Sequence, residues 1–522
     1  MGVQILLGLF KKIFNMKIPF HKMKKEDKLL ELVKEYQKEI ILLSNATALL
    51  GWDQETYMPS KAIESRSEQV SLLSSLIHEK LTSEKLFDAV KKLRNSKSVK
   101  GDDKIMIEKL YKDLLKARKI PNEFVKELSK TQSLAVKAWK EAKTKSNFKI
   151  FQPHLEKLVK LKIKEANYIK IPGHIYNSLL DSYEEGMTAE KLKPKFEKLK
   201  IDLLSLLNRI KNSEEYKKRE IKLMKKEITN EMQMYFIKDV IKRIGLNEEC
   251  SRIDFSEHPF TTKTGFNDVR ITTIIKKHNS LSSFGSSIHE AGHALYELNM
   301  PENHKYDILG DAPSLGIHES QSRFWENMIG LSKPFWIFYY PKFDAKLNIN
   351  GNLNQWYKEI NNVSAGFIRV DSDEVHYCLH VILRFEIELG LIEGSIKVKD
   401  LPLVWNKKMK EFFGLVVKND SEGVLQDIHW GWGNFGYFPT YALGTIYAAQ
   451  LYKVIKKKYP KIEQDIKKGD YSKIRLWLND NIHKYGRKLL TEEIIKKACG
   501  EGLNPDKYIS YLDKKYSKIY LD

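Results

Sequence analysis

Two histidines and a glutamate near the middle of the chain have the spacing of a metal site. His289, Glu290 and His293 form an HExxH string, and helical positions i and i+4 share one face. Both imidazoles can therefore bind one metal ion, while the carboxylate lies beside the ion's open position. HExxH strings also arise by chance, and two ordinary helix histidines are then the alternative interpretation. The string predicts a zinc site with its own general base.

The residues around this string favour a buried helix. Small residues fill positions 280–287, where a helix could start, and Met300-Pro301 would end it. Between these limits an apolar stripe has helical spacing and consists of Ile288, Ala291, Ala294 and Leu295. Gly292 lowers helix propensity but would let a neighbouring element approach closely.

A catalytic zinc site usually has three protein ligands, and Glu319 is the best candidate for the third. It lies in a second amphipathic segment, 316–325, which follows the first helix after a loop containing proline and glycine. A helix–loop–helix can return a carboxylate to the same metal. On these residues alone, a solvated glutamate is an equally good interpretation.

Several further motifs occur in a fixed order along the chain. They are LLGWDQET at 49–56, HPF at 258–260, DxRxT at 268–272, HESQ at 318–321, a near match to IRxxAD at 368–373, and GxxQDxHW at 423–430. In these motifs the chain resembles the carboxypeptidase Taq family of thermostable HExxH metallocarboxypeptidases, from about Glu26 to the C-terminus. Ser372 replaces the alanine of IRxxAD, a small exchange that bears only on local packing.

The resemblance implies roles for individual residues. His289, His293 and Glu319 would hold one divalent metal, zinc with cobalt as the alternative, and Glu290 would be the general base and acid. A tetrahedral oxyanion also needs a hydrogen-bond donor. The candidates are Tyr437, Tyr441, His258 and His429, for each of which aromatic or core packing is the alternative.

A carboxypeptidase also needs a cation for the terminal carboxylate of its substrate, and arginine binds carboxylate through two parallel hydrogen bonds. Arg369, in the IRxxAD-like segment, is the first candidate and Arg270 the second. Internal ion pairs with Asp373 and Asp268, respectively, are the alternatives. The same subsite would be framed by Gln426, His429 and Tyr441.

The predicted fold is mainly α, with two helical halves around a deep substrate groove and a small β-sheet beside the HExxH helix, as in zincins. Apolar residues recur at helical spacing in many segments, among them 203–210. Strand signals are scarce, and 252–255 with 269–275 suggest a short hairpin. Because the motifs are scattered yet serve one site, residues 23–522 are expected to form a single catalytic domain. The family resemblance further implies a homodimer.

Residues 1–22 form an N-terminal extension outside the resemblance. Their apolar run, 3–10, is too short to span a bilayer, and the lysines follow it, unlike in a signal peptide. The alternatives are an amphipathic membrane-contacting helix or a start codon assigned upstream of Met16 or Met23.

The formal net charge of +21 suggests a rival class, a non-catalytic basic binding protein. The lysines are spread along many helices and mixed with glutamate, so neither specific nucleic-acid binding nor stable membrane insertion is expected. The three cysteines lie far apart, which favours a reducing compartment, the cytoplasm. The sequence therefore predicts a broad-specificity metallocarboxypeptidase acting on peptides, with an oligopeptidase or endopeptidase on the same zinc site as the near alternative.

Overall fold

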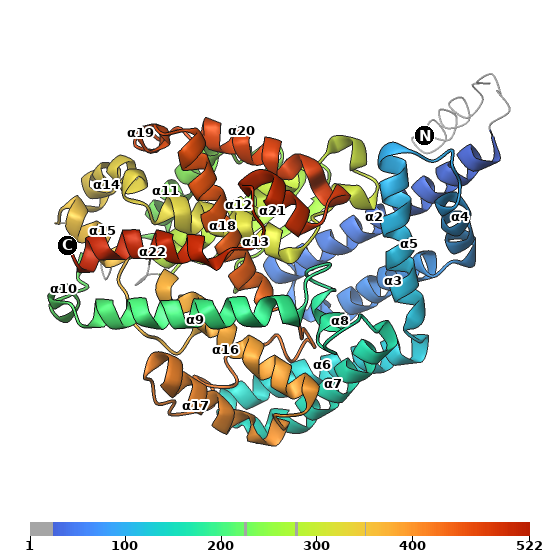
Figure 1. The fold of residues 1–522 in the computed structure, drawn as a ribbon, viewed down its shortest axis with the longest axis horizontal. Coiled ribbons are helices and arrows are strands. Elements are labelled where there is room, and N and C mark those ends of the chain that lie inside the picture. Colours follow the sequence, from blue (N-terminus) through green and yellow to red (C-terminus); the bar gives the residue numbers. More distant parts are fainter. Residues whose placement is uncertain (1–23, 224–226, 277–279, 350) are drawn as a thin grey trace.

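The computed structural model describes residues 24–223, 227–276, 280–349 and 351–522. The predicted extension at 1–22 lies outside these residues. The described chain is mainly helical with one small sheet, as predicted. Its long helices surround a group of helices at the centre of the molecule (Figure 1).

A first set of helices precedes the sheet. They are α2 (Lys25–Thr56), α3 (Ile63–Leu81), α4 (Glu84–Arg94), α5 (Gly101–Lys119), α6 (Asn122–Lys145), α7 (Phe148–Ile169), α8 (Asn177–Leu180), α9 (Ala189–Lys211), α10 (Glu214–Lys217) and α11 (Asn230–Ile244). In α9 the predicted stripe at Leu203, Leu206, Leu207 and Ile210 is buried.

A second set of helices follows the sheet and lies at the centre and in both the upper and the lower part of the view in Figure 1. They are α12 (Ser280–Leu298), α13 (Leu315–Arg323), the π-helix η5 (Phe324–Gly330), α14 (Lys333–Leu347), α15 (Leu353–Ile360), α16 (Glu374–Glu393), α17 (Leu401–Phe413), α18 (Pro439–Lys458), α19 (Ile462–Ile466), α20 (Ser472–Asn481), α21 (Thr491–Cys499) and α22 (Pro505–Tyr520). Short 3₁₀ turns include η4 (Ile308–Gly310), η6 (Arg369–Asp371) and η8 (His483–Lys488).

The sheet has the order β1-β3-β2, with β1 at Ser251–Phe255, β2 at Thr261–Gly265 and β3 at Asp268–Thr273. The predicted hairpin between the first and last of these segments is wrong, because β1 pairs with β3 in parallel. The antiparallel partner of β3 is β2. This edge strand has the sequence TTKTG, and its lysine and glycine weaken the strand signal.

Two hydrophobic clusters hold the described helices together. The larger cluster runs through the central helices and includes α16, where 18 of 20 residues are buried, Arg384 and Glu388 among them. The smaller cluster joins α2, α4 and α5 and is closed by Leu309 of η4. In Figure 1, α9 and α22 lie side by side, and α12, α13 and α18 lie at the centre.

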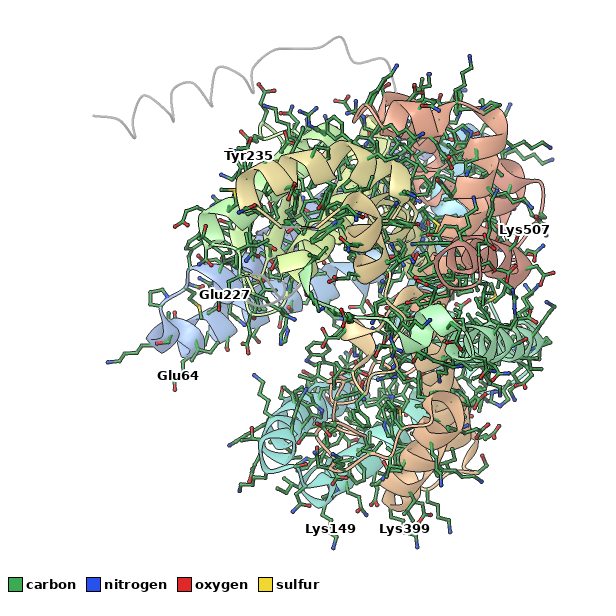
Figure 2. The ribbon with its side chains drawn as sticks, turned by 90° about the vertical axis from the view of Figure 1, so that its left-hand side faces the viewer. Glu64, Lys149, Glu227, Tyr235, Lys399 and Lys507 are labelled. Carbon is green, nitrogen blue, oxygen red and sulfur yellow. The ribbon has the colours of Figure 1, made fainter. Side chains whose placement is uncertain are left out.

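The helices are arranged in two bodies that are joined on one side. In Figure 2 Glu64 and Glu227 lie in the upper body, and Lys149 and Lys399 lie in the lower one. The arrangement confirms the predicted pair of helical halves. Among the described helices, none combines the length and the apolar character needed to cross a bilayer.

Candidate active site

The two histidines of the HExxH string and Glu319 meet at one point. The Nε2 atoms of His289 and His293 lie 3.6 and 3.3 Å, respectively, from Oε2 of Glu319. One ligand atom from each of the three residues lies within 4.8 Å of the others. Both imidazoles remain 17% exposed, whereas Glu319 is 7% exposed. Two nitrogens and a carboxylate oxygen with this spacing can hold one divalent cation.

Close helix packing brings these side chains together. A Cβ on Gly292 of α12 would lie 2.7 Å from the backbone of Gln321 and Ser322 in α13, so glycine permits this crossing, as the sequence indicated. On the other side of α13, a Cβ on Gly444 of α18 would lie 2.5 Å from Cγ of Glu319. The metal-ligand helices therefore pack almost backbone to backbone.

Glu326 and Arg323 hold two of the three candidate ligands, His289 and Glu319, in place. Nδ1 of His289 lies 2.8 Å from Oε2 of Glu326, and Nε of Arg323 donates to Oε1 of Glu319 at 2.8 Å. Nη1 of Arg323 also donates to Oε2 of Glu326 at 3.1 Å. Glu326 lies in the π-helix η5, a wider turn of the kind often found at functional sites.

His293 is oriented by a second chain of contacts. Its Nδ1 lies 2.6 Å from Nδ1 of His318, whose Nε2 lies 2.9 Å from Oε1 of Glu297. Lys263 of β2 completes the chain 3.2 Å from Oε2 of Glu297. All contacts are satisfied when each imidazole donates outward, which leaves Nε2 of His293 free to bind a metal.

Burial and neighbouring charges shift the pKa values of the three candidate ligands. Burial lowers the pKa of both imidazoles, but Glu319 and Glu326 outweigh it at His289 and raise that pKa to about 9. The pKa of His293 falls to about 4. Burial alone would raise the pKa of Glu319, yet His289 and Arg323 hold it below its usual range. Glu319 is therefore ionised at neutral pH, as a ligand must be.

Glu290 lies beside this centre and is held by Thr261 of β2. The Thr261 hydroxyl lies 2.6 Å from Oε2 of Glu290 and 3.0 Å from its backbone carbonyl oxygen. The Glu290 side chain is nearly buried, and this burial raises its pKa although His289 and Thr261 oppose the shift. A more basic carboxylate is suited to proton transfer near neutral pH.

Arg369 is part of a buried charge cluster. Its Nη2 donates to Oδ1 of Asp427 at 2.9 Å, and its Nη1 donates to the hydroxyl oxygen of Tyr377 at 3.2 Å. The alternative pairing with Asp373 is wrong, because Asp373 instead caps α16 by accepting from the backbone N–H groups of Val375 and His376. The Arg369 guanidinium also lies 4.6 Å from the ring centroid of Tyr441.

Gln426 and the aromatic candidates lie around this cluster. The side-chain oxygen of Gln426 accepts from the backbone N–H of Arg369 at 3.1 Å. Nε2 of His429 lies 3.1 Å from the Tyr441 hydroxyl, and the Tyr437 ring packs 5.3 Å from that of Tyr441. Burial and Glu319 raise the pKa of Tyr437 to about 12. Tyr437 therefore keeps its proton at neutral pH and can donate it in a hydrogen bond.

The other two candidates make no described contact with His289, His293 or Glu319. Arg270 pairs with Asp268 at 3.0 Å, the internal ion pair given as the alternative, and its guanidinium stacks 4.3 Å from the ring of Trp52. His258 is exposed in the loop between β1 and β2, and none of its described contacts reaches Glu290. Both residues flank the site through the sheet.

With this geometry established, similarity to known proteins becomes informative. Residues 32–516 match the carboxypeptidase Taq (M32) metallopeptidase family. The chain belongs to this family. It is 38% identical to thermostable carboxypeptidase 1 of Pyrococcus furiosus over 490 residues, which cover 93% of this chain and 98% of that protein. It is 36% identical to carboxypeptidase 1 of Bacillus subtilis, with 93% and 97% covered.

Solved structures of M32 carboxypeptidases have the same fold. The M32 carboxypeptidase of Deinococcus radiodurans R1 superposes with a TM-score of 0.92 at 33% identity, covering 95% of this chain and 100% of that one. A Pyrococcus furiosus carboxypeptidase gives 0.91 at 37% identity, with 95% and 99% covered. The chain is thus a metal-dependent carboxypeptidase, a peptidase hydrolase of the M32 family.

Sequence reasoning missed several residues of this M32 site. Thr261, Glu326 and Tyr377 contact site residues but carry no motif signal of their own. Arg323 and Glu326 follow Glu319 by four and seven positions, so helical periodicity could have placed them on its face. Arg384 lies 15 positions after Arg369 and donates from Nε to Oδ2 of Asp427 at 2.7 Å, and it had no comparable sequence signal.

Proposed function

We propose that His289, His293 and Glu319 bind one zinc ion, with cobalt as the alternative, and that the enzyme removes single residues from free peptide C-termini with broad specificity. The donor set supports this assignment. Both Nδ1 atoms are engaged by outer partners, and both Nε2 atoms lie near one carboxylate oxygen. Two imidazoles and one carboxylate are a ligand set of catalytic zinc. A bound divalent ion supplies Lewis acidity to the scissile carbonyl and acidifies a water molecule.

Glu290 is the general base in this proposal. Its carboxylate takes the proton of the attacking water and later delivers it to the leaving amine. Thr261 fixes one carboxylate oxygen, so the other oxygen is the one assigned to proton transfer. Tyr437 donates a hydrogen bond to the developing oxyanion, and His258 is the second candidate for this role.

Arg369 is the anchor for the terminal carboxylate of the substrate. Its side chain is 4% exposed, and a carboxylate binding there is shielded from water, which strengthens the interaction. Tyr441 and His429 line the same subsite, and Gln426 fixes the backbone of Arg369. Arg270, paired with Asp268 on the sheet, is the second candidate for this anchor.

One observation carries the proposal: His289, His293 and Glu319 converge on one point, and Glu290 lies beside them. This centre alone also fits an endopeptidase, so the anchor decides between the two activities. Metal-loaded protein should shorten a peptide from its free C-terminus one residue at a time, and mass spectrometry of the products would show the ladder. The same peptide with a C-terminal amide should stay intact. Internal fragments from both peptides would establish the endopeptidase instead.

The remaining proposals concern the whole protein. Residues 23–522 act as one catalytic unit, because the site draws on segments from β2 to α18. The family resemblance favours a homodimer, and three free cysteines favour the cytoplasm.

A further inference from the structure

The pairing of Arg369 with Asp427 raises an electrostatic question. A guanidinium paired with one carboxylate forms a neutral unit, and a neutral unit attracts a substrate carboxylate only weakly. Asp427 is firmly ionised, because Arg369 and Arg384 outweigh burial and hold its pKa far below the usual range. By itself, the Arg369–Asp427 pair would be a poor anchor.

A second arginine contacts the same carboxylate. Nε of Arg384 donates to Oδ2 of Asp427 at 2.7 Å, while Arg369 uses Oδ1. The cluster therefore holds two guanidinium charges and one carboxylate charge, a net charge of +1. We propose that Arg384 is a positioning residue that balances Asp427 and thereby leaves Arg369 with an unpaired positive charge for the terminal carboxylate of the substrate. This inference rests on the proposed anchor role of Arg369.

Arg384 acts through other side chains and cannot touch a substrate. It is fully buried, at 0% exposure. Its Nη1 donates to the backbone oxygen of His380 at 2.7 Å, and its Nη2 to the side-chain oxygen of Gln426 at 2.7 Å. The Trp405 ring lies 4.8 Å from its guanidinium. The same Gln426 oxygen accepts from the backbone of Arg369, so Arg384 fixes the position of Arg369 as well as its charge.

Neighbouring titratable groups cancel only part of the extra charge. Burial lowers the pKa of His429 to about 3 and that of His380 well below its usual value, so both imidazoles are neutral. Glu388 of α16 is the other acid that affects Arg384. Burial raises the pKa of Glu388 to about 7, and its carboxyl is already bonded to Tyr176, Trp430 and the backbone of Gly436. At neutral pH its charge is therefore only partial.

The test compares ligands that differ only in the terminal charge. Inhibition constants would be measured for N-acetyl-leucine and N-acetyl-leucinamide with the metal-loaded enzyme. Arg384→Gln should raise the constant of the acid about tenfold or more and leave that of the amide within about twofold. In Arg384→Gln the KM for a peptide with a free C-terminus should also rise, while kcat changes little. Arg384→Lys, which restores the charge, should recover most of the preference for the acid.

Two further variants make the outcome decisive. Arg369→Gln should lose the same preference, and Arg487→Gln, which removes a remote arginine paired with Asp113, should keep it. If Arg384→Gln changed the inhibition constants of acid and amide equally, while Arg369→Gln weakened only the acid, the role of Arg384 would be overturned and the anchor role of Arg369 would stand. An unselective Arg369→Gln would instead refute the anchor. If Arg384→Gln does not fold, loss of the preference in folded Arg384→Lys overturns the charge argument.

Discussion

Glu290→Gln lowers kcat about 10²- to 10⁴-fold, the usual contribution of a positioned general base, while the protein still binds its metal. The amide has nearly the shape of the carboxylate and can still accept a hydrogen bond from Thr261, but it cannot take a proton from water. Because Glu290 is not one of the three converging ligands, metal content stays at the level of the unmodified protein. The measurement is kcat on a free peptide together with the metal bound per chain after dialysis.

An exposed glutamate provides the control for this variant. Glu302 lies in a 3₁₀ turn after α12, and its side chain is 74% exposed, so Glu302→Gln should leave both quantities unchanged. Full turnover in Glu290→Gln would remove Glu290 from its role. Loss of the metal in that variant would make Glu290 a ligand instead.

Glu319→Gln is expected to abolish stable metal binding and, with it, activity. An amide oxygen is a much weaker ligand than a carboxylate, and the change also removes the negative charge between two imidazoles and Arg323. A readout independent of activity is the gain in thermal stability on adding zinc. A ligand at about 100 times its Kd stabilises the folded state by about 2.7 kcal/mol, and Glu319→Gln should lack this gain.

A graded variant separates a ligand from its outer partner. Glu326 contacts His289 rather than the metal position, so Glu326→Gln should weaken metal binding only about 10- to 100-fold and keep part of the stabilisation. If Glu319→Gln retained the full zinc-induced stabilisation, Glu319 would not be a ligand.

Part of the candidate metal centre could be predicted from residue spacing because its geometry is local, whereas the choice of Glu319 as the third ligand rested on the family resemblance. Helical periodicity alone puts His289 and His293 on one face, and the amphipathic pattern of 316–325 predicts the second helix. Gly292 at a helix crossing was also predicted from the sequence, and the structure shows the close contact that requires it. These features depend on spacing within one or two adjacent helices.

Other features depend on contacts between distant segments. Arg369 pairs with Asp427, 58 positions later, rather than with Asp373, four positions later, because the N-terminus of α16 uses Asp373 as its cap. Arg384 is buried within an apolar helix, and only the fold brings it to Asp427. Strand β2 was missed because it lies at the edge of the sheet. Its sequence, TTKTG, is polar throughout and lacks the alternation of apolar and polar residues that identifies a strand.

Anomalous diffraction at the zinc edge from crystals of zinc-loaded protein tests the metal assignment most directly. We expect one strong peak about 2.0–2.2 Å from Nε2 of His289, Nε2 of His293 and a carboxylate oxygen of Glu319. A protein that turns over peptide while showing no peak among these three side chains, or a peak elsewhere, would contradict the account.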